Sequence, residues 1–346
     1  MRWPSADVNP AAGDLYRFDA GVTVAIRGQR RARSYFRAEY GSAALAPGAE
    51  EPAVDVLIGA RLGEGAGTAG GHRELLGAHK LARWRALVPV TPEQRTMRLA
   101  VAVRGPLGLA LVQSSVIEPL VSLAAVRADS VLLPGAAIAQ GDRTVLVIGR
   151  SRTGKTSLAA RALAAGLRVL GDDQIIINAD RECRPFPRRL RLYPDLSRTA
   201  PAAFATLQPS VRTKLAALGR VNALTHGLVA PPVSVSPSTL GGNGDIPVRV
   251  LIGEVVVVRR ARVDTLTLEP LDAGELAAEA EDVLMGQRSA LFNVPGVQDA
   301  YETLLGHERA IIACALAGSQ ARRVLVPDSW SSERAVGALA GELELA

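Results

Sequence analysis

The chain has 346 residues, a formal net charge of +6, 48% hydrophobic residues and 21% charged residues. This balance is typical of a globular protein and excludes a chain that is disordered over most of its length. The two cysteines are too few for a disulfide framework and have no metal-binding spacing.

A chain of this length is expected to form two domains. The first ten residues, MRWPSADVNP, lack the apolar segment of a secretory signal peptide. No uninterrupted apolar stretch reaches the roughly 18 residues of a membrane span. We therefore expect a cytoplasmic protein with no membrane partner.

Residues 1–125 are expected to form an N-terminal α/β recognition domain. Small and β-branched residues alternate in GVTVAIRG (21–28), VDVLIGARL (54–62) and MRLAVAVRG (97–105), which predicts three strands. The glycine-rich stretch 63–72 has no Lys-Thr pair and no strand-to-helix setting, so we interpret it as a loop.

A short basic run, RGQRRARSYFR (27–37), has two interpretations. It is either a nucleic-acid-binding patch or a solvated strand end and turn. Because no nucleic-acid-binding motif accompanies it, we favour the second and expect no nucleic-acid partner.

Residues 126–346 are expected to form the catalytic domain, entered through a helix over 118–133. The apolar runs PGAAIAQ and TVLVIG are joined by GDR, and Gly-Asp between two such runs is typical of a hairpin. The segment 154–166 predicts a helix that Gly166 ends. Most phosphate-binding loops start from a parallel βαβ unit instead, so a hairpin is an unusual entry.

The segment between this hairpin and this helix, GRSRTGKTSL (149–158), fits the phosphate-loop pattern G-x-x-x-x-G-K-[ST]. Its glycines let backbone amides turn toward phosphate oxygens, and the helix N-terminus adds positive potential. Lys155 is expected to bridge the β- and γ-phosphates of ATP, and the Thr156 hydroxyl to bind Mg²⁺. The residues expected to bind the nucleotide are Gly149, Arg150, Ser151, Arg152, Thr153, Gly154, Lys155, Thr156 and Ser157.

Two adjacent acids, Asp172 and Asp173, lie in the apolar segment LRVLGDDQIIIN (167–178), which predicts a strand. Helix 155–166 rises about 16 Å at ~1.5 Å per residue. A strand running back over 168–173 covers about the same length at ~3.3 Å per residue. We therefore expect the acids to return to the level of the phosphates; the alternative is a strand end with both acids in solvent.

A carboxylate beside the terminal phosphate suits a kinase, which must orient and deprotonate an acceptor hydroxyl. A hydrolase needs a residue that positions water and an arginine finger, and the sequence has no clear switch motif of that kind. We expect Thr156 and Asp172 to hold Mg²⁺ and Asp173 to be the base. The reverse assignment of the two acids stays open.

Three arginines, Arg188, Arg189 and Arg191, follow the acids and are expected to contact a phosphate or an acidic acceptor, with plain surface as the alternative. The segment 229–247 is rich in Pro, Ser and Gly, which predicts a long surface loop of the kind that forms lids. Residues 248–263 predict a buried strand or hairpin.

The hairpin into the phosphate loop, the helix after it and GLRVLGDD (166–173) resemble the HPr kinase/phosphorylase family. In that family the last stretch reads roughly R-G-H-x-L-V-A-D-D, and the fold is related to that of phosphoenolpyruvate carboxykinase. The segments PFPRRLRLYPD (185–195) and IPVRVLIGEVVVVRR (246–260) are similar to later parts of divergent members. The likeness covers roughly residues 120–346.

The resemblance implies an α/β fold with a P-loop kinase core and a mixed sheet, with Asp172 and Asp173 at the catalytic centre acting toward a serine hydroxyl. It also implies a homo-oligomer, since hexamers occur in that family. The chain departs from the family at Arg152, where a glycine is common, and at Leu167, where a histidine stands. It also has no E-x-R-G-x-G signature, so the resemblance does not extend to HPr as acceptor or to phosphorylase activity.

The expected function is that of an ATP- and Mg²⁺-dependent kinase acting on Ser or Thr of a small protein or precursor peptide. More distant relatives of the resembled family phosphorylate a serine of lasso-type precursor peptides. Two alternatives stay open: a small-molecule kinase of natural-product or sugar metabolism, and a nucleotide-dependent switch or slow NTPase.

Overall fold

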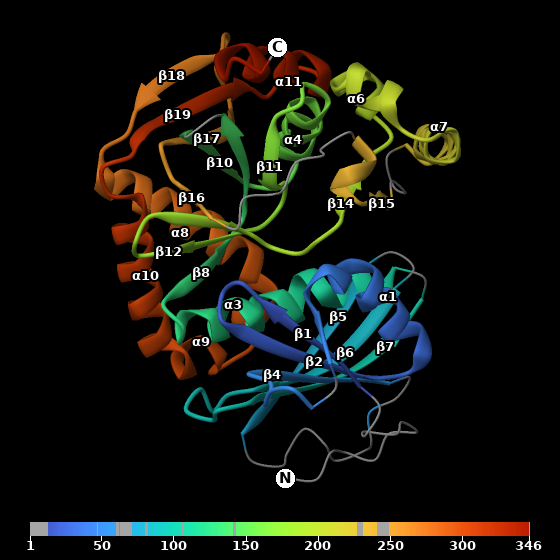
Figure 1. Ribbon diagram of the computed structural model, residues 1–346, viewed down its shortest axis with the longest axis vertical. Coiled ribbons are helices and arrows are strands. Elements are labelled where there is room, and N and C mark those ends of the chain that lie inside the picture. The colour runs from blue at the N-terminus through green and yellow to red at the C-terminus, as the bar shows by residue number, and fades with distance from the viewer. Residues whose placement is uncertain are drawn as a thin grey trace. The chain divides into compact units, whose positions relative to one another are not determined.

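The computed structural model describes residues 13–46, 48–59, 62, 71–79, 82–105, 107–140, 143–226, 231–240 and 249–345. The chain divides into two compact units, one of 1–132 with 284–311 and the other of 133–283 with 312–346 (Figure 1). The expected division at residue 125 differs from this one at its boundary and in the segment 284–311. Both units combine helices with strands, which confirms the α/β class.

The first unit contains a seven-stranded mixed sheet in the order β3-β1-β2-β4-β7-β6-β5. The pairs β2–β4 and β4–β7 are parallel, and the other described pairs are antiparallel. The three strands predicted from alternation are β2, β4 and β7, which lie at the centre of this sheet because most of their side chains are apolar. The strand bounds are β1 (Gly13–Phe18), β2 (Val22–Gly28), β3 (Ala44–Leu45), β4 (Val54–Gly59), β5 (His72–His79), β6 (Ala82–Pro89) and β7 (Met97–Arg104). Residues 63–70 of the expected glycine-rich loop lie outside the described residues.

The basic run 27–37 is not a strand end and turn, because most of it belongs to helix α1 (Arg30–Tyr40). Ala32, Phe36 and Tyr40 follow one another at four-residue spacing and are buried. That spacing places them on one face, while the arginines between them occupy the rest of the helix surface.

The predicted helix 118–133 is shorter than expected. Helix α3 (Glu118–Val126) ends before Asp129, whose backbone adopts a φ of 52°, and β8 (Ser130–Leu133) follows. A positive φ outside glycine interrupts a right-handed helix. Before α3 lie α2 (Gly108–Val112) and a π-helical turn (Gln113–Ile117).

The continuous helical stretch Gly108–Val126 is long and apolar enough to cross a membrane by length and composition, although it contains polar residues. Of its most apolar window, 72% is buried inside the protein. Core helices pass the same test of length and composition, so this stretch is weak evidence for a membrane span.

The second unit contains a six-stranded mixed sheet in the order β11-β9-β10-β17-β19-β18. The predicted hairpin is confirmed, because β9 and β10 pair antiparallel from Gly135↔Ile148 to Gln140↔Arg143. On its other side β10 pairs in parallel with β17, and β17 with β19. The strand bounds are β9 (Gly135–Gln140), β10 (Arg143–Gly149), β11 (Arg168–Gly171), β17 (Glu254–Ala261), β18 (Thr267–Pro270) and β19 (Gln320–Pro327).

The segment 167–178 is two strands rather than one. It divides into β11 and β12 (Ile175–Asn178), and β12 pairs with β13 (Glu182–Pro185) outside the six-stranded sheet. At Gly171 an added Cβ would lie 2.4 Å from the Gln174 carbonyl oxygen, so the chain turns too tightly there for a longer side chain. Asp172 and Asp173 therefore lie at a junction between strands.

The two later segments also differ in detail from their predictions. Within 229–247 the described residues form β15 (Val233–Val235) and a 3₁₀ turn (Pro237–Leu240). The segment 248–263 gives β16 (Val250–Leu251) and β17, which do not pair with each other: β16 pairs with β13. A further pair joins β14 (Leu190–Leu192) to β15.

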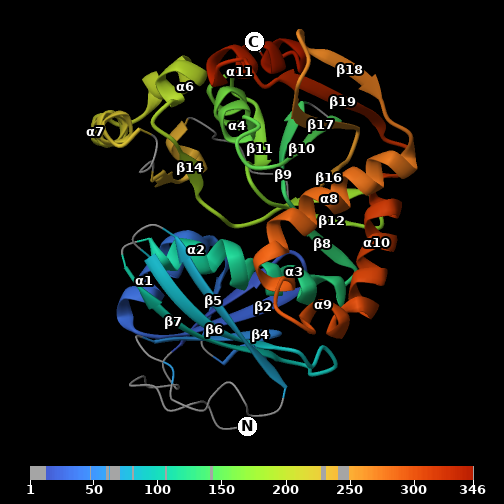
Figure 2. The same ribbon diagram turned by 180° about the vertical axis from the view of Figure 1, so that it is seen from behind.

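Helix α4 (Lys155–Ala164) packs against β9, β11 and the C-terminal helix α11 (Ser332–Glu342), as Figures 1 and 2 show. Leu158, Ala159 and Ala162 of α4 belong to the buried core of this unit. Small alanines let the helix approach the sheet closely, which fixes the position of its N-terminus. The remaining helices are α5 (Leu196–Thr199), α6 (Pro201–Thr206), α7 (Pro209–Leu224), α8 (Ala273–Phe292), α9 (Val297–Ala300) and α10 (Glu302–Leu316).

Candidate functional site

The phosphate-loop sequence connects the end of β10 directly to the start of α4. Gly154 precedes the helix with φ of 99°, and an added Cβ would lie 2.9 Å from the Val336 side chain. At Gly149 an added Cβ would lie 2.8 Å from the Val258 carbonyl oxygen. Both glycines are therefore required by the path of the backbone.

Lys155 is buried at the start of α4, where its ammonium lies within the loop. Its Nζ donates to the carbonyl oxygens of Gly149 (2.6 Å) and Arg150 (2.9 Å). Burial lowers the pKa of Lys155, and the charges of Asp173 and Asp172 oppose this shift. The lysine is thus close enough to both acids for their charges to act on it.

Asp172 is 4% exposed and accepts a hydrogen bond from the Thr156 hydroxyl. Among the described residues its Oδ2 atom has no hydrogen-bond partner, although it is buried. Burial and then the neighbouring charge of Asp173 raise the pKa of Asp172 to about 6. The expectation that the acids return to the phosphate loop therefore agrees with the geometry.

Asp173 lies in a different environment, with 41% of its side chain exposed. Its Oδ2 forms an ion pair of 2.9 Å with Nη1 of Arg188, whose side chain is only 3% exposed. Burial raises the pKa of Asp173, but the charges of Arg188, Lys155 and Arg191 outweigh this and hold it below its usual value. The pKa values of the two neighbouring acids are thus shifted in opposite directions.

The three arginines after the acids have separate surroundings. Arg188 contacts Asp173, and Arg191 on β14 acts on both acids through its charge. Arg189 instead donates to the carbonyl oxygen of Ser234 in β15. Of the three arginines expected to contact a phosphate or an acidic acceptor, Arg188 and Arg191 therefore act on the two acids.

Tyr193 belongs to the same region and was not singled out by sequence reasoning. Its side chain is exposed, and burial of its inner part, followed by the charge of Asp173, raises the pKa of the phenol. No sequence pattern marks this tyrosine, because its neighbourhood depends on how β14 packs beside the acids.

The other loop residues differ in exposure and in their contacts. Ser151 and Arg152 are exposed, and the backbone of Arg152 adopts φ of 70°. The Thr153 hydroxyl donates to the Arg150 carbonyl (2.9 Å), so it braces the turn. The Ser157 hydroxyl donates to that of Thr199 (3.0 Å), which anchors α4 to α5.

The oxygen donors at the loop fit Mg²⁺, which prefers carboxylate and hydroxyl oxygens together with substrate phosphates. Asp172 offers a buried oxygen with no described partner, next to the Thr156 hydroxyl. No group of three or more His, Cys, Asp or Glu side chains in the described part of the chain could hold a metal by itself. Mg²⁺ does not require such a cage when phosphates complete its shell.

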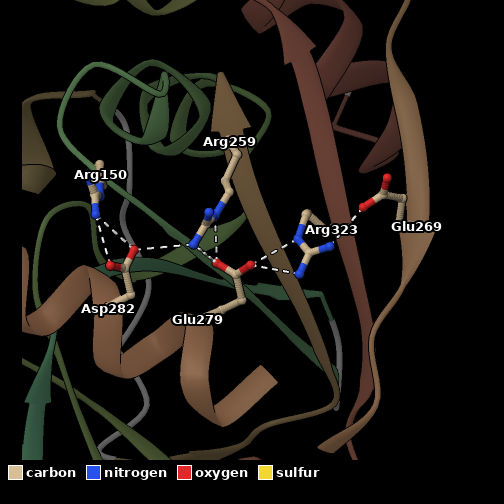
Figure 3. Close-up of polar contacts among 6 residues, drawn as sticks. All are labelled: Arg150, Arg259, Glu269, Glu279, Asp282 and Arg323. Carbon is tan, nitrogen blue, oxygen red and sulfur yellow. Dashed lines mark hydrogen bonds and ion pairs between the residues drawn. The ribbon is translucent and has the colours of Figure 1, made fainter. Parts of the chain in front are cut away.

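A chain of ion pairs ties the outer side of the loop to the rest of the second unit (Figure 3). Arg150 contacts Asp282 of α8 (2.9 Å), and Asp282 also contacts Arg259 of β17 (3.2 Å). The chain, which we call the charge ladder, continues from Arg259 through Glu279 and Arg323 to Glu269, with contacts of 2.6, 2.8 and 2.8 Å.

No protein-family model matches this chain, and no curated protein matches it significantly. A strand-loop-helix with a buried lysine, a threonine and a pair of acids can hold a polyphosphate and place a carboxylate beside it.

Proposed function

We propose that this protein is an ATP-dependent kinase with an HPr-kinase-like P-loop core, which transfers the γ-phosphoryl group to a hydroxyl of Ser or Thr on a small protein or peptide. The observation that carries the proposal is the pair Asp172–Asp173, one residue of which contacts Thr156 of the phosphate loop. One acid beside the loop suits any protein that binds a nucleotide with Mg²⁺, whereas the second and more exposed carboxylate is what transfer to a hydroxyl requires in addition.

In this proposal Lys155 leaves the carbonyls of Gly149 and Arg150 and binds the β- and γ-phosphates, together with the loop amides. Thr156 and Asp172 would hold Mg²⁺, which would neutralise charge on the phosphates. The raised pKa of Asp172 supports this role. Burial disfavours the ionised carboxylate, and a cation beside it would stabilise that ionised form.

Asp173 would receive the proton of the acceptor hydroxyl, because it is the more exposed of the two acids. The acceptor oxygen bonds to the γ-phosphorus as the bond from that phosphorus to the bridging oxygen breaks, and ADP leaves. Arg188 fixes the Asp173 carboxylate in place. The positive charge of Arg188 keeps this carboxylate ionised, which is the form that can accept a proton.

The test is transfer of label from γ-labelled ATP with Mg²⁺ to a mixed library of Ser- and Thr-containing peptides. Asp173→Asn is expected to reduce transfer at least about 100-fold, since general base catalysis contributes about 10²–10⁴. ATP binding, measured separately by calorimetry, should change little. The matched control is Asp180→Asn, an exposed carboxylate in the turn after β12.

Retained transfer by Asp173→Asn would refute the base assignment. Label found only on small molecules supports a metabolite kinase on the same core. Release of free phosphate with every acceptor supports a switch or slow NTPase.

A further inference from the structure

Residues 184–226, which we call the basic segment, carry a large excess of positive charge. It holds a single acid, Asp195, and eight basic residues: Arg184, Arg188, Arg189, Arg191, Arg198, Arg212, Lys214 and Arg220. The rest of the chain then has 32 basic and 33 acidic residues, out of totals of 40 and 34. The segment thus has a charge of +7 and the rest of the chain a charge of −1, and Arg188 of the segment contacts Asp173 of the site.

The basic segment ends in α7, a helix at the margin of the second unit beside β15 (Figures 1 and 2). Only Leu215 of its 16 residues is buried. Within the described residues, Lys214 and Arg220 form no ion pair, and both are exposed. α7 thus presents cations that nothing described in the fold neutralises.

The outer face of α7 also carries exposed apolar side chains. Thr213, Ala217, Val221 and Leu224 are spaced by four, four and three residues and are all exposed, with Leu224 at 81%. This spacing places them in one stripe, with Lys214 on one side of it and Arg220 on the other. An exposed leucine and valine that lie between two cationic side chains suit a partner that is both apolar and acidic.

α7 is connected to the site through Tyr193. An added Cβ at Gly219 of α7 would lie 3.6 Å from the Pro194 side chain, so the helix packs beside the residue after Tyr193. Tyr193 itself is exposed and is close enough to Asp173 for that charge to act on its phenol. Gly219 lies on the same side of α7 as buried Leu215, so the inner side of the helix adjoins Pro194 and Tyr193, and the stripe lies on the opposite side.

We propose that the stripe of α7, together with Lys214 and Arg220, docks an acidic, partly apolar peptide segment, and that a Ser or Thr in the chain beyond this segment extends to Asp173. This deepens the proposed kinase function and rests on it. Carboxylates of the peptide would pair with Lys214 and Arg220, and its apolar side chains would cover Val221 and Leu224. A nucleic acid would use the cations but would leave the two aliphatic side chains exposed, so the peptide is favoured.

The test uses a fluorescein-labelled 16-residue peptide of Glu, Leu and one Ser in an amphipathic repeat, with a second peptide in which every Glu is Lys. Fluorescence anisotropy measures the binding of each to the full-length protein. The acidic peptide is expected to bind at least about tenfold more tightly than the basic one. Lys214→Glu with Arg220→Glu should weaken its binding about tenfold, because two attractions become repulsions.

The matched control is Arg262→Glu, an exposed arginine of the same unit outside the basic segment, which should leave binding unchanged. Circular dichroism checks the fold of the double variant, and Lys214→Ala with Arg220→Ala, which introduces no new charge, replaces it if it fails to fold. The proposal is overturned if the acidic peptide binds no better than the basic one, if the double variant binds it normally, or if single-stranded RNA binds α7 in its place.

The same peptides are then incubated with γ-labelled ATP and Mg²⁺. Binding of the acidic peptide with transfer to its serine supports both proposals. Binding that depends on α7 without any transfer keeps the docking surface and rejects the kinase. Transfer to both peptides at equal rates keeps the kinase and rejects the docking surface.

Discussion

At the scale of single residues, Asp172 is held in an unfavourable state by the fold. It is buried, it lies beside another acid, and one of its oxygens has no hydrogen-bond partner among the described residues. Its pKa is raised from 3.8 to about 6, which corresponds to a penalty on the order of 3 kcal/mol when the group is ionised. Such a penalty is typical of residues retained for function rather than for stability.

The sign of the pH effect follows from this shift. Between about pH 4 and pH 6 the folded protein keeps a proton on Asp172 that the unfolded chain has released. The contribution of Asp172 to the free energy of unfolding therefore falls as the pH rises through this window. Asp172→Asn is expected to stabilise the protein at pH 7, by up to about 3 kcal/mol, and to change it little at pH 4.

Urea unfolding at pH 4, 5, 6 and 7 without ATP and Mg²⁺ measures this difference. Asp173→Asn provides the contrast, because loss of its contact with buried Arg188 should lower stability, by about 1 kcal/mol at this half-exposed site. An Asp172→Asn variant that is less stable than the natural protein at pH 7 would contradict the inference that the fold disfavours the ionised form of Asp172.

At the scale of elements, the charge ladder holds α8, β17, β19 and the phosphate loop together. Its centre is Glu279, with a side chain 6% exposed, and its end is Glu269, with a side chain 40% exposed. Glu279 accepts from both Arg259 and Arg323, whereas Glu269 contacts Arg323. The two glutamates therefore differ in burial while sharing one partner.

Glu279→Gln is expected to lower the free energy of unfolding by about 2 kcal/mol, because a buried carboxylate between two arginines is lost. Glu269→Gln should cost less than about 0.5 kcal/mol, since exposed ion pairs contribute little. Urea unfolding of both variants compares them directly. Equal effects of the two substitutions would mean that the ladder does not stabilise the unit through its buried centre.

At the scale of the whole molecule, the first unit is built from two separate parts of the chain. Residues 284–311 supply Tyr301, whose hydroxyl donates to the Pro89 carbonyl (2.9 Å), and the buried pair Arg288–Glu308 (2.6 Å). Arg288 also donates to the Ser122 hydroxyl of α3. A fragment of residues 1–132 lacks all of these partners.

This fragment is expected not to fold alone, because it leaves the surface that Tyr301 and Arg288 cover exposed to water. Co-expression of 1–132 with 133–346 as separate chains should restore a stable complex. The measurements are near-ultraviolet circular dichroism and urea unfolding of the fragment and of the complex. A cooperative unfolding transition of 1–132 by itself would show that the later segment is dispensable.

The sequence by itself determined the elements that depend on near neighbours in the chain. The hairpin β9–β10, the phosphate loop with Gly149 and Gly154, and helix α4 follow from alternation, glycine placement and helix propensity over short windows. The return of Asp172 to Thr156 also followed from simple lengths, because one helix and one strand span equal distances.

Only the tertiary structure decided where distant residues meet. The pairing of Arg188 with Asp173, the neighbourhood of Tyr193, the charge ladder and the joining of 284–311 to the first unit all link residues far apart in the chain or on different elements. The end of β11 at Gly171 could not be predicted from the sequence either. β11 and β12 form one apolar run in the sequence, and only the structure shows that β11 pairs with β9 and β12 with β13. The pattern of apolar residues in a short stretch of sequence indicates which face of a helix or strand is apolar. Which element then covers that face, and which charged side chains pair, depends on the tertiary structure.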